Sequence, residues 1–231
     1  MVKGTFQVTK SDSASPEVSY TGLKNASSAI IPATITDADG TVYRVTSIAK
    51  NAFKGNQKLK IVKIGSNITS IGAHAFQGCK KLTKLVFSRN ITKIGSHAFQ
   101  NCTNLTSVQI PGNVKTIEAG TFSGCTKLKT ATIAGSVTAI KDQAFYNCKK
   151  LTKLTVPGKV ASIGKQAFYN CKSLKTITIR TTKLTSKTIG KQAFKGISKK
   201  TIIRVPKSKK NAYQKLLQAK GLNVKVKIKA F

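Results

Sequence analysis

The chain has 231 residues, with 41 Lys or Arg against only 6 Asp or Glu, so its formal net charge at pH 7 is +35. Since 40% of the residues are hydrophobic, a core can form and wholesale disorder is not expected. The scarcity of carboxylates argues against most acid–base, carboxylate–metal and glycosidase chemistry. No run of 18 apolar residues occurs, so we expect no membrane span.

The first 29 residues are predicted to form an N-terminal β cap. Short runs in which apolar and polar residues alternate are typical of one or two antiparallel strands. The apolar members of these runs are Phe6, Val8, Val18, Tyr20 and Leu23.

From residue 30 to residue 206 the dominant feature is an internal repeat of 23 residues. Each unit contains a short alternating strand, followed by apolar residues too irregular for a second long strand and too interrupted by Gly for a long helix. A unit of this size cannot bury its apolar side alone, so stacked units are predicted to form a solenoid with strands about 4.8 Å apart. Two columns mark the period: Phe76, Phe99, Phe122, Phe145 and Phe168, and Cys79, Cys102, Cys125, Cys148 and Cys171.

The first coil is interrupted before it reaches the regular repeat. Ile31-Pro32 matches the end of a repeat strand, but extra residues separate it from Ile48. Asp39-Gly40 lies within these extra residues, between two short apolar runs, and predicts a β-hairpin.

Residues 207–231 are predicted to form a C-terminal cap of a helix and a strand. Ser208 is expected to be the N-cap of a helix that reaches Lys220, with Gly221 as its stop. Alternating apolar and Lys residues from Asn223 to Ala230 predict a final half-buried strand. Caps are needed because an open solenoid would otherwise expose a sheet edge and an apolar face.

The repeat motif resembles the BspA-like class of bacterial leucine-rich repeats. It reads Leu-x-x-Leu/Ile-x-Ile-Pro and then Val-x-x-Ile-Gly-x-x-Ala-Phe-x-x-Cys, over about residues 30–206. The resemblance implies an α/β repeat solenoid, a right-handed leucine-rich-repeat coil of about seven 23-residue units with one parallel sheet on its concave face and a cap at each end. It also implies a buried ladder of Asn67, Asn90 and Asn113 that satisfies backbone groups of the turns.

The cysteines and histidines suit structural roles better than chemical ones. Stacked Cβ atoms about 4.8 Å apart exceed the roughly 3.8 Å that a disulfide prefers, and the spacing of 23 lacks the form of a zinc site, so we expect a buried ladder of reduced thiols. His74 and His97 lie one period apart, but no further metal ligand stands beside them. Their column continues with Gly120 and then three Gln residues, which predicts an exposed polar position.

We predict no enzyme, no cofactor and no metal. The sequence shows no paired carboxylates, no nucleophile with an adjacent base, and no phosphate-binding or dinucleotide motif. Glu118 lies one period from Lys141, and we expect these two residues to form a surface ion pair.

Positive charge is the remaining functional signal. Residues 143–231 hold 23 Lys or Arg and no acid, whereas residues 1–142 hold 18 Lys or Arg and all 6 acids, which gives net charges of +23 and +12. An extensive surface of one sign attracts polyanions, although Lys also serves simply as a soluble surface residue. The candidate basic patch consists of Lys149, Lys150, Lys153, Lys172, Lys175, Lys207, Lys209 and Lys210.

The resemblance implies a non-enzymatic, secreted or cell-surface adhesion module, with a protein or an anionic polysaccharide or wall polymer as partner. The first six residues lack the apolar core of a secretory signal, so we expect neither signal nor anchor in this sequence, which is compatible with a fragment. Two alternatives stay open: a structural spacer with no ligand, and a nonspecific nucleic-acid binder. Outward strand positions lack aromatics for base stacking, and Tyr146 and Tyr169 are expected to stack on the loop side, where they suit a protein contact. We expect a monomer.

Overall fold

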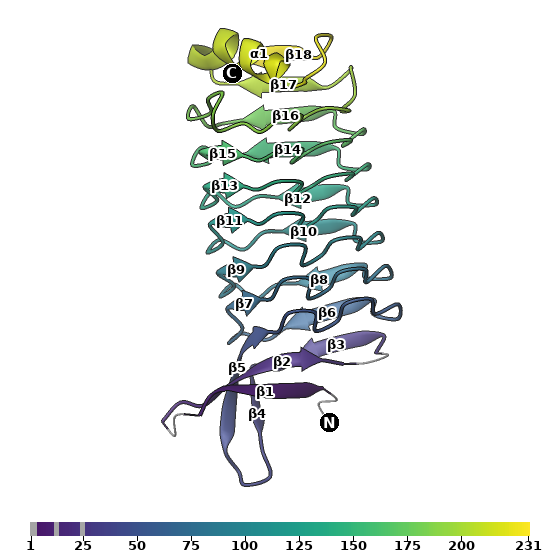
Figure 1. The fold of residues 1–231 in the computed structure, drawn as a ribbon, viewed down its shortest axis with the longest axis vertical. Coiled ribbons are helices and arrows are strands. Elements are labelled where there is room, and N and C mark those ends of the chain that lie inside the picture. Colours follow the sequence, from purple (N-terminus) through teal and green to yellow (C-terminus); the bar gives the residue numbers. More distant parts are fainter. Residues whose placement is uncertain (1–3, 12–13, 24–25) are drawn as a thin grey trace.

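The computed structural model describes residues 4–11, 14–23 and 26–231. It is a β-solenoid of about nine turns, in which the coils follow one another in chain order from the N-terminal to the C-terminal end (Figure 1). The predicted repeat solenoid is therefore confirmed. Each coil has three sides, two of which carry strands, while the third consists of turns.

The first column of strands runs the length of the solenoid and pairs in parallel. Its strands begin just after the Leu column, and within each of its two sheets a strand lies opposite its equivalent in the next coil, as Ser107 lies opposite Thr130. Three strands form one sheet: β3 (Ser28–Ile31), β6 (Ile61–Ile64) and β8 (Lys84–Val86). Six strands form the next: β10 (Ser107–Gln109), β12 (Thr130–Thr132), β14 (Lys153–Val156), β16 (Thr176–Ile179), β17 (Ile202–Val205) and β18 (Lys227–Ala230).

The structure has a second column of parallel strands in addition to the single parallel sheet that the resemblance implies. Most of its strands are only two residues long, because a Gly, Glu or Lys and then a tight turn follow at once. The N-terminal part comprises β2 (Glu17–Gly22), β5 (Val42–Ile48), β7 (Ser70–Ile71) and β9 (Lys93–Ile94), and the C-terminal part comprises β11 (Thr116–Ile117), β13 (Ala139–Ile140) and β15 (Ser162–Ile163).

Both strand columns are interrupted at the same coil boundary, between β8–β9 and β10–β11. Thr83 N donates to Lys60 O at 2.9 Å and Lys129 N to Thr106 O at 2.8 Å. In the described part of the chain, the equivalent bond from Thr106 N to Thr83 O is missing. The turn side stays joined, since His97 N donates to Ala119 O at 2.8 Å. The boundary thus lacks strand pairing on two sides, although Asn113 Nδ2 donates across it to Arg89 O at 3.1 Å, and it is closed on the third side.

Two bulky residues coincide at this boundary. Phe87 occupies a slot that Ile fills in neighbouring coils, and its ring meets Phe99 edge-on at 5.8 Å. At Gly95 an added Cβ would come within 2.5 Å of Ala73 N, yet the equivalent residue in the next coil is Glu118. Lys141 also carries a Cβ in that slot and its coil still pairs, so we infer that Phe87 and Glu118 act together.

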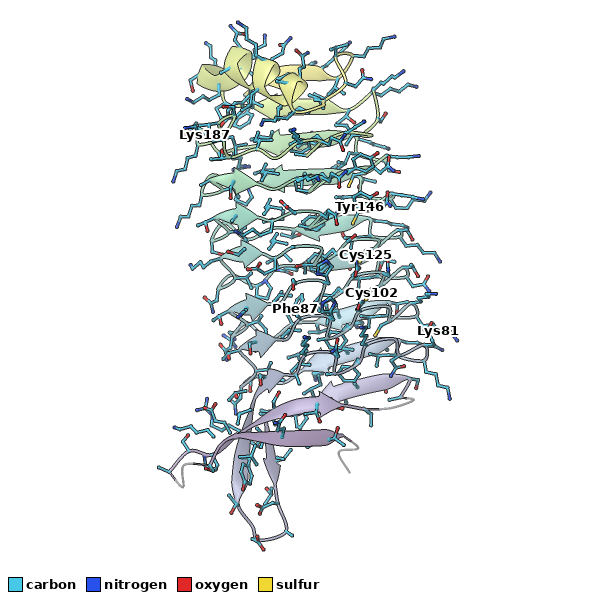
Figure 2. The ribbon with its side chains drawn as sticks, viewed as in Figure 1. Lys81, Phe87, Cys102, Cys125, Tyr146 and Lys187 are labelled. Carbon is cyan, nitrogen blue, oxygen red and sulfur yellow. The ribbon has the colours of Figure 1, made fainter. Side chains whose placement is uncertain are left out.

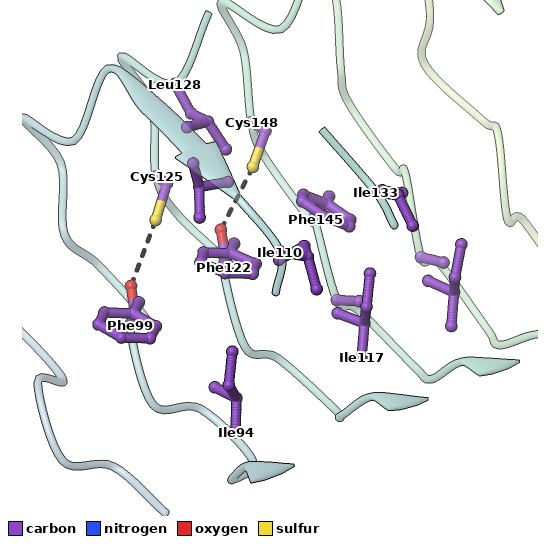
Figure 3. Packing of buried hydrophobic residues seen from close by; sticks show 14 of the residues in the cluster. Ile94, Phe99, Ile110, Ile117, Phe122, Cys125, Leu128, Ile133, Phe145 and Cys148 are labelled. Carbon is purple, nitrogen blue, oxygen red and sulfur yellow. Dashed lines mark hydrogen bonds between the residues drawn. The ribbon is translucent and has the colours of Figure 1, made fainter. Parts of the chain in front are cut away.

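A stack of Phe rings forms the centre of the core. From Phe53 to Phe194, neighbouring rings lie 4.9–5.5 Å apart and almost parallel, and those from Phe76 to Phe168 are fully buried. Each Cys thiol donates to the carbonyl oxygen of the Phe in the preceding coil, as Cys125 Sγ does to Phe99 O at 3.2 Å (Figure 3). The thiols therefore link coils as well as fill space.

The N-terminal end is closed by antiparallel strands and a projecting hairpin (Figure 1). Of the predicted cap at residues 1–29, positions 1–3, 12–13 and 24–25 lie outside the described residues. Strand β1 (Thr5–Lys10) pairs antiparallel with β2, and β4 (Thr34–Thr36) pairs antiparallel with β5. Asp37 closes this hairpin, because its Oδ1 accepts hydrogen bonds from Asp39 N and Thr41 N.

The C-terminal helix starts later than predicted. A 3₁₀ turn, η1 (Lys207–Lys209), precedes α1 (Lys210–Ala219), whose N-cap is Lys209 without a side-chain cap bond. Ser208 as N-cap is therefore wrong, because it lies inside the 3₁₀ turn that follows Pro206. Gly221 ends the helix with φ +92, and the last strand is shorter than predicted, with Val224 74% exposed.

Tyr213 of α1 anchors the C-terminal helix to the coil beneath it. Its buried hydroxyl donates to Thr181 O at 3.0 Å and accepts from Leu184 N at 3.1 Å. Because both partners are backbone groups of the loop after β16, the helix closes the end of the solenoid at a defined position.

Candidate polyanion-binding surface

Five lysines of the predicted basic patch lie on two consecutive coils and are exposed. Lys149 and Lys172 occupy equivalent turn positions one coil apart, and Lys149 and Lys150 are adjacent in one turn. Lys153 opens β14 and points outward, while Lys175 precedes β16. The structure thus brings Lys149, Lys150, Lys153, Lys172 and Lys175 onto neighbouring coils.

The other three lysines of the predicted patch belong to the C-terminal cap and lie apart from these five. Lys207 and Lys209 are in η1 and Lys210 begins α1, above β17 at the end of the stack (Figure 1). Lys207 and Lys210 are exposed, whereas Lys209 is half-buried. The predicted patch is therefore two clusters rather than one.

Basic side chains also reach beyond this patch. Figure 2 shows Lys81 and Lys187 on opposite edges of the solenoid, with long basic side chains along both edges. Sequence reasoning omitted Lys187 because it lies in the insertion before the last Phe, outside the repeat columns. Positive charge therefore lies along both edges of the solenoid as well as in the predicted patch.

Carboxylates do not neutralise these lysines. Among the described residues, the expected ion pair between Glu118 and Lys141 is not formed, because half-buried Glu118 instead lines a cleft of about 420 Å³ beside Gly95 and Ser96. The Asp142 carboxylate accepts a hydrogen bond from Lys165 N at 2.8 Å. The acid nearest to the lysine cluster in sequence is therefore bound to the backbone.

The outward face of the first strand column is polar from β10 onward. It carries hydroxyls and amides, such as Gln109, Thr130 and Thr155, all exposed. At the coil boundary the same face is hollowed by a groove of about 570 Å³, which Phe87 and Arg89 line together with Gln109. This groove combines an apolar wall with a single cation.

On the turn side, Tyr146 and Tyr169 stack with ring centroids 5.2 Å apart and an interplanar angle of 9°. Beside them runs a ladder of half-buried amides, in which Gln143 Nε2 donates to Gln166 Oε1 at 3.0 Å and Gln166 Nε2 to Gln192 Oε1 at 2.9 Å. The sequence did not predict these hydrogen bonds between the Gln side chains of successive coils, which we call the Gln ladder.

The column of His74 and His97 needs a left-handed backbone, which explains its composition. Its φ values lie between +55 and +62 in six coils, a region that excludes β-branched residues. The histidines are half-buried and not exposed as predicted, because their rings stack at 5.0 Å and both Nδ1 atoms are buried without a hydrogen-bond partner. Burial, followed by the charge of His74, lowers the pKa of His97.

The Asn ladder differs from the buried one that the resemblance implies. Asn67 is half-buried and Asn90 and Asn113 are exposed. Each amide nevertheless donates to a carbonyl oxygen of the preceding coil, for instance Asn90 Nδ2 to Ser66 O at 2.8 Å. The ladder satisfies turn carbonyls at the rim of the core.

The five cysteines are buried and unbridged. Burial raises the pKa of Cys79, Cys125 and Cys171 to about 12 and that of Cys102 and Cys148 well above the ordinary value. Such thiols are poor nucleophiles, since the thiolate is the reactive form. Across the described ranges, no three His, Cys, Asp or Glu side chains gather as a metal site would require.

Comparisons with known proteins place this geometry in a family. The BspA-type leucine-rich repeat region matches in 6 copies, over residues 41–152 and 138–228. A leucine-rich repeat protein of T. pallidum is 25% identical with a TM-score of 0.77, and the match covers 93% of both chains. A leucine-rich cell-surface protein of Faecalibacterium prausnitzii is also 25% identical, with a TM-score of 0.59, over 89% of this chain and 70% of that one.

A comparison with curated proteins found no match. In the part of the chain that is described, no helix has the length and apolar character needed to cross a bilayer. The family match extends over most of the 231 residues, and the repeat, the Phe stack and the parallel strand columns agree with it. The chain belongs to the BspA-type leucine-rich repeat proteins.

Proposed function

We propose that this protein is a non-enzymatic, secreted or cell-surface binding module that takes anionic polymers or anionic proteins on its basic C-terminal half. The observation that carries the proposal is a cluster of five exposed lysines on two coils, within residues 143–231 that contain no acid. The likeness to a leucine-rich cell-surface protein supports the location.

Electrostatics favours a polyanion as the ligand of this surface. Lys149 and Lys172 occupy equivalent positions on successive coils, roughly 4.8 Å apart at the backbone, so their like charges repel each other. A polymer with many negative groups relieves this repulsion and releases its own counterions when it binds. Neutral or cationic partners would gain neither contribution.

Experiments can distinguish two other functions from the proposed one. A structural spacer would bind no polyanion above about physiological salt, where exposed charges more than roughly 8 Å apart are screened. A nonspecific nucleic-acid binder would prefer DNA or RNA to other polymers of equal charge density.

The test compares two sets of five Lys→Gln substitutions at exposed positions, with equal charge change. The C-terminal set is Lys149, Lys150, Lys153, Lys172 and Lys175, and the N-terminal set is Lys50, Lys54, Lys58, Lys60 and Lys63, all exposed. On a heparin column, the C-terminal set should elute at clearly lower salt than the N-terminal set. Equal elution of both sets, or no shift with the C-terminal set, would support charge as a solubility device and the spacer instead.

A further inference from the structure

We propose that Tyr146 and Tyr169 form a recognition platform for acidic polysaccharide, in which the two phenol hydroxyls bind sugar hydroxyls and the flanking lysines bind the acidic groups. This inference rests on the proposed polyanion-binding function and adds its ligand class. It also replaces the expectation that the tyrosines serve a protein contact.

The platform consists of one four-residue turn that occurs twice in succession. Tyr-Asn-Cys-Lys stands at residues 146–149 and again at 169–172, whereas the equivalent turns of other coils carry Gln, Ser or Lys in place of Tyr. The two copies are one coil apart, because Asn147 N donates to Tyr169 O at 2.9 Å. An aromatic ring and a cation three residues apart are thus presented twice, in register.

The stacked rings leave their hydroxyls available and their shared faces closed. One face of each ring covers the other at 5.2 Å, so a ligand cannot enter between them. Both residues are half-buried, and among the described residues neither hydroxyl has a hydrogen-bond partner. Each hydroxyl can donate one hydrogen bond and accept others, which matches the chemistry of a sugar hydroxyl.

The Gln ladder makes the neighbouring surface rigid. Tyr146 N donates to Gln143 O at 3.0 Å, so each Tyr is tied to the Gln three residues earlier. The amides of Gln143, Gln166 and Gln192 are bonded to one another across three coils. A surface whose side chains are fixed before binding loses less conformational entropy when a ligand arrives.

Charge decides which sugar polymers fit the platform. Lys149 and Lys172 end the two turns and are exposed, and Lys150 is adjacent. The nearest acid in sequence, Asp142, is bound to Lys165 N. A polymer that carries both hydroxyls and sulfate or carboxylate groups satisfies the phenols and the ammonium groups together.

Nucleic acid fits the same surface less well. Base recognition without sequence preference relies on open aromatic faces on which bases stack. Here the two rings cover each other, so one face of each ring is closed to a base. We therefore favour acidic polysaccharide over single-stranded nucleic acid as the ligand of this platform.

The experiment removes only the two hydroxyls, with the double variant Tyr146→Phe and Tyr169→Phe, which keeps the rings and their stacking. Heparin and inorganic polyphosphate serve as probes, because both are polyanions but only heparin carries sugar hydroxyls. Affinity for heparin should fall about fivefold for each hydroxyl removed, and affinity for polyphosphate should stay unchanged. Tyr43→Phe, in the distant N-terminal hairpin, is the matched control and should change neither affinity.

The outcomes separate this inference from the proposed function. Unchanged heparin affinity in the double variant, or an equal loss for heparin and polyphosphate, would overturn the platform while leaving polyanion binding intact. Loss of single-stranded DNA binding together with unchanged heparin binding would assign the tyrosines to nucleic acid and also overturn it. If the unmodified protein binds neither heparin nor polyphosphate at about 150 mM salt, the proposed function itself fails.

Discussion

The Phe column shows how a single side chain supports two neighbouring coils. Phe122 is fully buried between Phe99 and Phe145, at 5.5 and 5.4 Å. Phe122→Ala should lower the free energy of unfolding by about 3–5 kcal/mol, because the turn that carries Phe122 is hydrogen-bonded to the turns of both neighbouring coils, which keeps the cavity from collapsing. Chemical denaturation measures this loss, and a value below about 1 kcal/mol would contradict a core role.

The cysteines should be chemically silent in the folded protein. Burial raises the pKa of Cys125 to about 12, and its Sγ is bonded to Phe99 O, so almost no thiolate exists at neutral pH. Thiol titration should therefore be slow under native conditions and should reach five thiols per chain after unfolding without reductant. Fewer than five in the unfolded chain would reveal a disulfide.

The stacked histidines predict a loss of stability on acidification. The pKa of His97 is lowered by burial and by His74, so the unfolded chain binds more protons than the folded chain below the unfolded value of about 6.5. Stability is fully present above about pH 6.5 and falls as the pH drops from there through the lower folded pKa.

Thermal unfolding between pH 7.5 and 5 measures this effect. Replacement of both histidines with Gln, the residue found three times in the same column, should flatten the dependence in that range. An unchanged slope in this variant would show that the histidines are not its cause.

The residues with a left-handed backbone show what single residue types can and cannot predict. One column contains both Gly and Asn, as in Gly78, Asn101 and Gly124, and that mixture is itself a signal of positive φ. The other contains His and Gln, which indicate polarity but not backbone conformation, so their stacking and hydrogen bonding could not be read from the sequence.

At the scale of elements, the coil boundary between β8–β9 and β10–β11 is the weak point of the solenoid. Lys115 N should donate to Thr92 O if the pattern of Thr138 N and Lys115 O continued, but within the described residues it does not. In each strand column the boundary therefore separates two sheets that would otherwise be one. The coils on its two sides are held together mainly by hydrogen bonds of the turn side.

Amide hydrogen exchange should show this opening. The amides of Thr106, Lys115 and Glu118 should exchange faster than the equivalent bonded amides of Lys129, Thr138 and Lys141, because protection requires a hydrogen bond that must first break. The double variant Phe87→Ile and Glu118→Gly should restore protection at the first three. Equal protection in the unmodified protein would show that the sheets are continuous.

The sequence predicts a strand where the alternation of apolar and polar residues extends over several positions. The Leu-x-x-Val-x-Ile pattern indicates the first strand column, whereas two-residue strands such as β9 and β11 are too short for any alternation. The helix start failed for a local reason, since Pro206 sets up a 3₁₀ turn that takes in Ser208. Short elements depend on neighbouring coils more than on their own residues.

For the whole molecule, repetition made the solenoid predictable and left the ligand undetermined. A 23-residue period with aligned Phe and Cys can bury its apolar residues only by stacking. Lysines at the surface obey no such constraint, so the sequence indicates the net charge but not the two clusters into which Lys149 and Lys207 separate. The stacking of Tyr146 and Tyr169 follows from the 23-residue period, whereas the hydrogen bonds between the Gln residues beside them could not be predicted from it.

The most direct test of binding by the C-terminal half is the salt dependence of affinity for single-stranded DNA, a polyanion of known charge spacing. The logarithm of affinity should fall linearly with the logarithm of salt concentration, by about 0.7 for each phosphate neutralised. Replacing the five C-terminal lysines with Gln should flatten this slope by up to about 3.5, and replacing the five N-terminal lysines should flatten it much less. Equal slopes for the two variants would contradict a polyanion site on the C-terminal coils.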